Sequence, residues 1–208
     1  IVVVTSIRSY FGHKRHNAVD ENLLRGWIIA VPAGALLASA AAAYMSSGML
    51  RAVFAVVCIL IAVKLLVGRD DWRLGKDLPG NPLRAVVGAA IGFLSTLMGI
   101  GGGVLNNTFM TAYGRPIHQA VATSAGIGML IAIPGFLGYI WAGLGQTGLP
   151  PFSTGFVNWL AVALLIPMSI IVTPYGVKTA HALPKRRLEL LLGAYLVFVA
   201  VRFGWSLL

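Results

Sequence analysis

The stretch "GFLSTLMGIGGGVLNN", residues 92–107, places three consecutive glycines inside a long apolar run. The surrounding residues 85–114 contain no Asp, Glu, Lys or Arg. As one straight helix this run would be ~45 Å long, which exceeds the ~30 Å hydrocarbon core of a bilayer. Glycine is also a poor residue for a helix interior. The run therefore predicts a helical hairpin, broken or re-entrant, with its bend at residues 99–103.

The whole chain has the composition of an integral membrane protein. Hydrophobic residues make up 58% of it, charged residues only 11%, and the mean hydropathy is +0.84. A soluble domain must keep a polar outside, which this composition does not supply. The net charge of +10 would also suit a nucleic-acid-binding protein, but the charges fall in short stretches between apolar runs. We therefore expect a lipid bilayer, and not nucleic acid, as the partner.

The apolar runs predict an all-α polytopic membrane protein. About 20 apolar residues cover a bilayer as a helix. Besides the hairpin, we expect helices over about 23–46, 49–68, 117–142, 155–178 and 186–207, with a turn-rich loop over 143–155.

Lys and Arg gather in three segments, which we place on the cytoplasmic side because basic loops stay inside. These segments are 8–25, 69–84 and 178–187. The uncharged loop over 143–155 then lies outside. Even numbers of crossings separate the three basic segments, as this orientation requires.

The two halves of the chain carry the same features in the same order. "VVVTS" at residues 2–6 resembles "AVATS" at residues 120–124. A helix with a mid-span proline follows in each half, and then a helix with an arginine at its start. The charges put the loop after the first Thr-Ser helix inside and the loop after the second outside. This order predicts two inverted repeats, an architecture that favours alternating access in transporters.

We place the repeats at residues 1–68 and 85–208, joined by a basic cytoplasmic linker over 69–84. The first repeat lacks a Gly-rich hairpin. Because residue 1 is Ile and the chain opens on the end of an apolar run, we expect further residues upstream.

These motifs resemble the TauE/SafE family of sulfite exporters and related anion permeases. The resemblance is carried by "GIGGG" at residues 99–103, by "AVATS" at residues 120–124, and by the proline-containing helix and basic turn that follow. It implies a transporter, most simply an exporter, of a small sulfur-containing anion such as sulfite or an organosulfonate. It also implies two Gly-rich hairpins, a multi-pass protein of the plasma membrane (in bacteria, the inner membrane), and a possible homodimer.

The positions of the acidic residues, histidines and cysteine argue against an enzyme or a metal protein. Five of the six acids fall in predicted loops and the sixth, Glu189, is near a helix start, so no proton relay of buried carboxylates is expected. The four histidines stand near predicted helix ends, and there is one cysteine, Cys58, in an apolar run. We expect no catalytic residues, no metal ion and no cofactor.

The glycine bend has the features of an anion site. A helix that starts there presents free backbone N–H groups and a partial positive charge, and glycine lets a ligand approach the backbone. Neutral hydroxyl and amide donors can hold an anion without a buried cation. The candidate substrate-binding residues are Gly99, Gly101, Gly102, Gly103, Ser95, Asn106, Asn107, Thr123, Ser124, Thr5 and Ser6, with Thr96 as a further donor.

Alternatives remain open at this point. Small residues also pack membrane helices closely without any ligand, and packing is the better interpretation of Gly88 and Gly92. Thr123 and Ser124 could bond back to carbonyls of their own helix. Tryptophans are expected as anchors at the membrane interface. At the level of function, a passive anion channel and a membrane-embedded enzyme or assembly subunit compete with the transporter.

Overall fold

The computed structural model describes residues 2–14, 18–67, 75, 77–182 and 185–205, and this part of the chain is almost entirely helical. It divides into two compact units, 1–44 with 73–160 and 45–72 with 161–208. The first unit contains α1 (Val2–Lys14), α2 (Glu21–Trp27), α3 (Ala30–Tyr44), α5 (Leu83–Met98), α6 (Gly103–Ala112), α7 (Ile117–Ala142) and the strands β1 (Ser153–Thr154) and β2 (Val157–Asn158). The second contains α4 (Ser47–Val67), α9 (Lys185–Trp205) and α8 (Trp159–Ala182) from residue 161 onward.

The helices follow the predicted apolar runs closely. Within the described residues, α4 and α7 are each long and apolar enough to cross a membrane, and α2 with α3 makes a third span if the bent pair is one crossing. The apolar parts of α5, α8 and α9 are shorter. The loop predicted at 143–155 extends to Asn158 and holds the short antiparallel pair β1–β2. Residues 69–74 and 76 of the predicted linker lie outside the described residues.

The predicted single helix over 23–46 is wrong in one respect, because it is broken. α2 and α3 meet at an angle of 46°. Pro32 has no backbone N–H, so the carbonyl of Ile28 has no helical donor at that position, and kinks in helices concentrate at such prolines. The break places the short helix α2 against α5 and α7.

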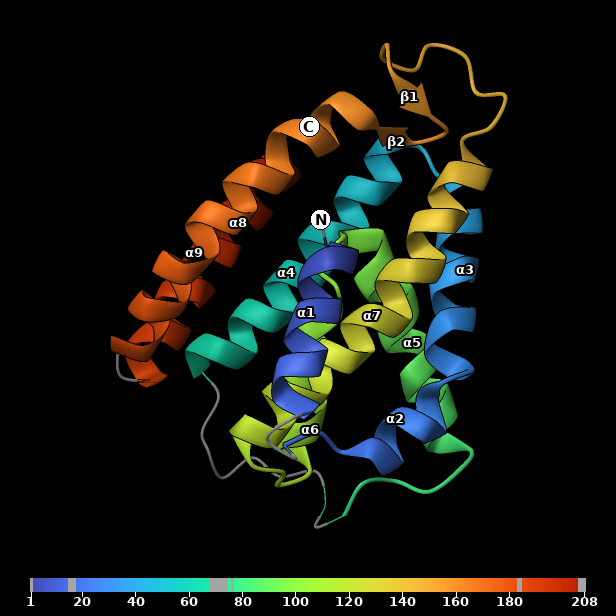
Figure 1. Cartoon of the computed structure of the whole chain (residues 1–208). Helices are drawn as coiled ribbons and strands as arrows, with labels where there is room; N and C mark the ends of the chain where they lie inside the picture. Colours follow the sequence, from blue (N-terminus) through green and yellow to red (C-terminus); the bar gives the residue numbers. More distant parts are fainter. Residues whose placement is uncertain (1, 15–17, 68–74, 76, 183–184, 206–208) are drawn as a thin grey trace. The chain divides into compact units, whose positions relative to one another are not determined.

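The predicted hairpin is present as α5 and α6, with the break at the glycines. α5 ends at Met98 and α6 begins at Gly103. Both helices contact α7, which lies between α1 and α3 in Figure 1. α7 is therefore the central helix of this unit, and many of its residues are buried, including Thr123, Ser124 and Ile127.

Small residues let α3 and α5 pack with their backbones in contact. A Cβ at Gly34 would lie 2.1 Å from the carbonyl oxygen of Ala89, and a Cβ at Gly92 would lie 2.2 Å from that of Val31. Neither carbonyl could remain in place beside a methyl group. The packing interpretation of Gly92 is thus confirmed, and the same holds for Gly88, whose Cβ would meet the ring of Trp27 at 2.6 Å.

Trp27 itself is buried, so the expectation of an anchor at the membrane interface is wrong for this tryptophan, whereas Trp141, Trp159 and Trp205 are exposed. Its side chain is 0% exposed and its indole Nε1–H donates to the carbonyl of Arg84 at 2.6 Å. The ring packs on Phe109 of α6 with the centroids 5.4 Å apart. Trp27 therefore links α2, α5 and α6 in the core of the first unit.

In the second unit, α4 and α9 pack antiparallel. Phe54 and Phe203 meet edge to face with ring centroids 5.1 Å apart, and at the other end Gly193 lies against Leu66. The guanidinium of Arg186 donates to the carbonyls of Leu65 and Leu66 at 3.0 and 2.8 Å. Arg186 at the start of α9 therefore satisfies carbonyls at the end of α4, where a cation also suits the helix dipole.

Candidate functional site

The glycine bend between α5 and α6 uses backbone conformations that favour glycine. Gly99, Gly101 and Gly102 have φ values of 68°, 63° and 78°, in the left-handed region that side-chain-bearing residues rarely occupy. Gly99 ends α5, and its N–H donates to the carbonyls of Ser95 and Thr96. Gly102 caps the start of α6. The three residues thus turn the chain within the space of one short break.

At two of the four glycines, close packing is a second reason why no residue with a side chain fits. A Cβ at Gly101 would lie 2.6 Å from Val2 Cγ1, and a Cβ at Gly102 would lie 2.4 Å from Ile131 Cδ1. At Gly99 and Gly103 a Cβ would meet nothing within 4 Å. The bend is therefore closed around Gly101 and Gly102 and open at Gly103, the first residue of α6.

The N-terminus of α6 has the features of an anion site. Its cap, Gly102, has no side chain to accept from the first amides of the helix. Unpaired N–H groups and the helix dipole make such an end electropositive. No charged side chain stands in residues 85–114 to compete for these amides.

Three buried polar atoms of α5 and α6 have no hydrogen-bond partner. They are Ser95 Oγ, Thr96 Oγ1 and Asn106 Oδ1, on residues 0%, 4% and 0% exposed. Ser95 Oγ is 3.6 Å from where a Cβ of Gly102 would stand, so this hydroxyl faces the cap of α6. Buried polar groups normally have partners. Ser95 thus presents an unpaired hydroxyl beside the uncapped start of α6.

Asn106, Ser124 and Asn107 form a hydrogen-bonded cluster that ties α6 to α7. Asn106 Nδ2 donates to Ser124 Oγ at 2.7 Å, and Ser124 Oγ donates to Asn107 Oδ1 at 2.6 Å. Ser124 Oγ is also 3.5 Å from the carbonyl oxygen of Gly103. Ser124 therefore bonds to the neighbouring helix and the alternative of bonding back to its own helix does not apply.

Thr123 has a different role in the structure. It is fully buried, and its Oγ1 accepts from the backbone N–H of Asp20 at 2.9 Å. Asp20 is the N-cap of α2 and accepts from Leu23 N–H at 3.0 Å. Thr123 thus holds the start of α2 against α7. Nothing in the sequence indicates this pairing, because the two residues are far apart in the chain.

The first-half residues Thr5 and Ser6 are only partly brought to the bend. Thr5 Oγ1 donates to the carbonyl of Val2 within α1 at 3.2 Å. A Cβ at Gly128 would lie 2.6 Å from Ser6 Oγ and 3.0 Å from the carbonyl oxygen of Gly101. Ser6 therefore lies on the same face of α7 as the carbonyl oxygen of Gly101, beside the bend, whereas the Thr5 hydroxyl is engaged in its own helix.

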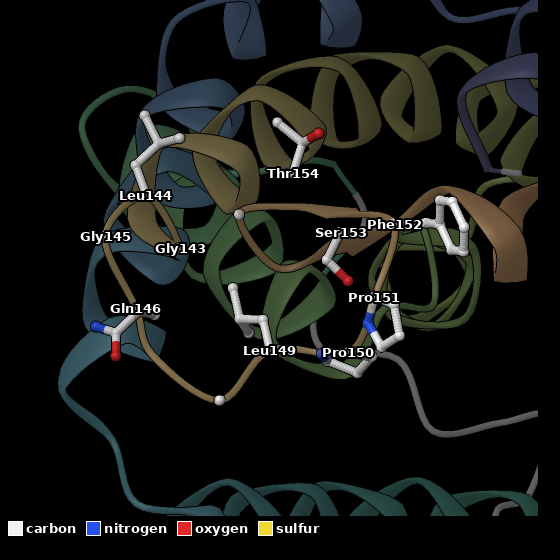
Figure 2. A pocket seen from close by; sticks show the side chains of 12 residues that line it. Gly143, Leu144, Gly145, Gln146, Leu149, Pro150, Pro151, Phe152, Ser153 and Thr154 are labelled. Atoms are coloured by element: carbon white, nitrogen blue, oxygen red, sulfur yellow. The ribbon is translucent and has the colours of Figure 1, made fainter.

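Two hollows elsewhere in the first unit were not expected from the sequence. One, of 550 Å³, is formed by the loop over residues 143–155 and is lined mainly by backbone and apolar side chains (Figure 2). The other, of 230 Å³, lies between α1, α2 and α7, with Tyr10, Lys14 and Arg25 among its lining residues. Residues of the glycine bend line neither of them.

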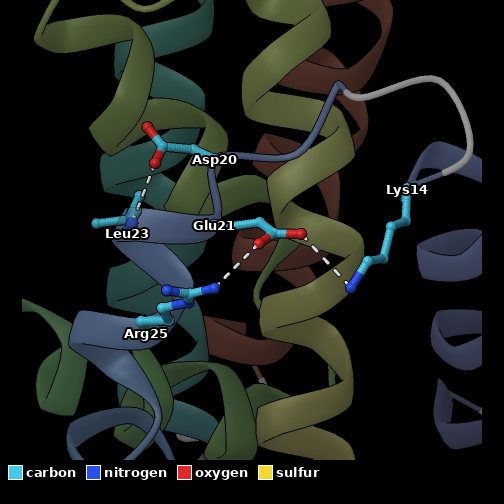
Figure 3. A network of polar contacts seen from close by, with 5 residues as sticks. All are labelled: Lys14, Asp20, Glu21, Leu23 and Arg25. Carbon is cyan, nitrogen blue, oxygen red and sulfur yellow. Dashed lines mark hydrogen bonds and ion pairs between the residues drawn. The ribbon is translucent and has the colours of Figure 1, made fainter.

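An ion-pair network stands at the rim of the smaller hollow (Figure 3). Glu21 lies 3.4 Å from Lys14 Nζ and 3.5 Å from Arg25 Nη2. The Tyr10 phenol and, next, the Glu21 carboxylate raise the pKa of Lys14 above its ordinary value. The three charged side chains are between 47% and 79% exposed, so solvent screens this network and it contributes little stability.

The described residues do not provide a conventional metal centre. No three of their His, Cys, Asp or Glu side chains gather closely enough to hold a metal ion. The chemistry available at the bend is thus hydrogen bonding from backbone amides, hydroxyls and amide side chains.

Comparison with known proteins finds a family and two membrane-transporter relatives. The chain matches the family model described as "Sulfite exporter TauE/SafE" over residues 1–203. It is 32% identical over 151 residues to a "probable membrane transporter protein" of Haemophilus influenzae, covering 72% of this chain and 56% of the relative. It is 25% identical over 154 residues to a protein of Methanocaldococcus jannaschii with the same description, covering 74% and 56%. The chain thus spans just over half the length of these relatives. No solved structure matches it.

Proposed function

Because this chain belongs to the TauE/SafE sulfite exporter family, we propose that it carries small sulfur-containing anions, such as sulfite or an organosulfonate, out of the cell by alternating access. The observation that carries this proposal is the unpartnered, fully buried Ser95 hydroxyl facing the glycine-capped start of α6. A small oxyanion would accept from the first amides of α6 and from the Ser95 and Thr96 hydroxyls.

The candidate residues contribute in different ways to this proposed site. Gly99, Gly101 and Gly102 shape the bend, and the open position at Gly103 leaves room for the anion. The Asn106–Ser124–Asn107 cluster fixes α6 on α7. Ser6 lies beside the Gly101 carbonyl, where α1 meets the bend. Thr123 and Thr5 act at a distance, through the packing of α2 and α1 on α7.

Packing within each unit supports the proposed inverted repeats over 1–68 and 85–208, with the linker at 69–84. The repeat pairs α1 with α7 and α4 with α9. α1 packs antiparallel on α7, because Ser6 lies against Gly128 and Tyr10 against Gly126. α4 and α9 are antiparallel as well. Antiparallel contact between equivalent helices is what a two-fold axis in the membrane plane produces.

We place the protein in the plasma membrane, the inner membrane if the source is bacterial, and we retain a homodimer as an expectation. Light scattering of the purified protein would measure the oligomeric mass. A monomeric mass at all concentrations would exclude the dimer and leave the transport proposal intact.

The test is flux of labelled sulfite in proteoliposomes, with thiosulfate, sulfate and methanesulfonate as competitors. Because the chain spans just over half the length of its relatives, a version extended upstream is measured beside it. Saturable, competed flux is the expected result. Absence of flux from both versions would refute the proposal.

The same vesicles separate the competing functions. Uphill accumulation driven by an ion gradient would establish a coupled carrier, whereas flux that only follows the substrate's own gradient would favour a passive channel. Product formation in detergent, without vesicles, would favour the enzyme alternative.

Gly103→Ala tests the site more directly. A methyl group there meets nothing within 4 Å and Ala suits a helix, so we expect stability to be unchanged or up to about 1 kcal/mol higher. The methyl group would nevertheless occupy the space at the first amide, so we expect flux to fall at least about tenfold. Gly12→Ala in α1, equally free of neighbours, is the matched control and should transport normally.

A further inference from the structure

Asn106 is held in one orientation by the cluster around it. Its Nδ2 is 2.7 Å from Ser124 Oγ, 3.5 Å from the carbonyl oxygen of Ala120 and 3.4 Å from Met110 Sδ. The Ser124 hydroxyl directs its own proton to Asn107 Oδ1 at 2.6 Å, so it accepts from Asn106. Turning the amide over would set Oδ1 against a carbonyl oxygen and a sulfur, which are acceptors. Both amide hydrogens are therefore used on α7 and α6.

This orientation leaves Asn106 Oδ1 as a buried acceptor without a donor. Asn106 stands one turn into α6, where its N–H donates to the carbonyl of Gly102 at 3.0 Å. Side chains on a helix lean toward the helix N-terminus, so this one leans toward the proposed anion site. An acceptor there cannot serve a fully deprotonated anion, since that ligand has no hydrogen to donate.

The absence of charged residues from the apolar runs around the proposed site also favours a ligand that is not fully deprotonated. Residues 85–114 and 117–142 contain no Lys, Arg, Asp or Glu. The solvation energy lost on burial grows with the square of the ionic charge, so a dianion costs roughly four times as much to bury as a monoanion. Neutral donors alone therefore select a singly charged ligand.

We propose that the site at the start of α6 takes a monoanion that carries one hydrogen, such as hydrogen sulfite, with its oxygens on the α6 amides and the Ser95 hydroxyl and its hydrogen on Asn106 Oδ1. This inference rests on the proposed function and specifies the protonation state of the transported species. Methanesulfonate, a monoanion at all relevant pH values with no acidic hydrogen, fits the donors but leaves Asn106 Oδ1 unpaired. The sulfite dianion fits neither requirement.

The experiment measures initial flux of labelled sulfite and of labelled methanesulfonate in the same proteoliposomes. The pH is equal on both sides and is stepped from below to above the second pKa of sulfurous acid, and flux through protein-free vesicles is subtracted. We expect the ratio of sulfite to methanesulfonate flux, each at the same total concentration, to fall about tenfold per pH unit above that pKa, in step with the hydrogen sulfite fraction. Methanesulfonate corrects for any pH effect on the protein itself.

The substitution Asn106→Leu provides a second test, of the acceptor itself. It keeps the size of the side chain but removes the acceptor, so below that pKa we expect the ratio to drop about tenfold, while methanesulfonate flux drops less. If this variant does not fold, the pH profile of the unmodified protein still tests whether hydrogen sulfite is the transported species. A ratio that stays constant or rises with pH would overturn the inference and leave the transporter standing. Absence of flux for both anions would overturn the proposed function together with it.

Discussion

Replacing Gly102 by Ala tests the packing of the bend most sharply. The left-handed conformation, φ 78°, costs a residue with a Cβ about 1–2 kcal/mol. The new Cβ would lie 2.4 Å from Ile131 Cδ1, against 3.4 Å for the nearest ordinary contact, so the Ile131 side chain must move by about 1 Å. Overpacking of this kind costs about 1–3 kcal/mol. We expect Gly102→Ala to lower the free energy of unfolding by about 2–5 kcal/mol.

Gly99→Ala is the matched control, because it has the same kind of backbone strain, φ 68°, and a Cβ there meets nothing within 4 Å. It should cost only the conformational term of about 1–2 kcal/mol. The assay is unfolding of both variants and the parent by a denaturing detergent in mixed micelles, followed by helix content. If Gly102→Ala destabilised no more than Gly99→Ala, Ile131 would not pack on the bend as described, and the argument would fail.

Three other substitutions probe the surrounding structure. Gly92→Ala should destabilise the protein by about 1–3 kcal/mol in the same assay, because a backbone carbonyl cannot move aside as a side chain can, whereas Gly12→Ala should not; equal stabilities would contradict the α3–α5 packing. Ser124→Ala should cost about 1–3 kcal/mol by leaving buried amide groups unpaired, and unchanged stability would show that the cluster is hydrated. Glu21→Gln should lower the pKa of Lys14, measured by NMR of the labelled side chain, and leave the unfolding midpoint unchanged because the pair is exposed; an unshifted pKa would contradict the ion pair.

The positions of the helices were largely predictable because membrane depth sets their length. The expected helix over 117–142 coincides with α7, and the expected break at 99–103 coincides with the gap between α5 and α6. Helix ends there are fixed by local features, such as a glycine with positive φ. The break between α2 and α3 was not predicted, although Pro32 stands mid-span in the expected helix over 23–46, because a mid-span proline is also compatible with one kinked but continuous helix.

The candidate site was predictable in its location but not in its connections. The glycines and nearby hydroxyls identified the region. The tie between Thr123 and Asp20, or the burial of Trp27 between three helices, depends on which faces of distant helices meet. Likewise, the sequence suggests Ser95 and Asn106 as donors, but only the packed structure shows which of their atoms remain unpartnered. Such pairings arise from tertiary packing, for which a single sequence carries no periodic signal.

The contact between α3 and α5 has a mechanical consequence. Two carbonyl oxygens, of Val31 and Ala89, each project over a glycine on the opposite helix. These two contacts oppose both sliding and rotation of α3 relative to α5, so we expect the two helices to move as one rigid pair. Motion of this pair relative to its neighbours is then expected at its ends, at the break after α2 and at Gly99, where a moving α6 would carry its polar cluster with it.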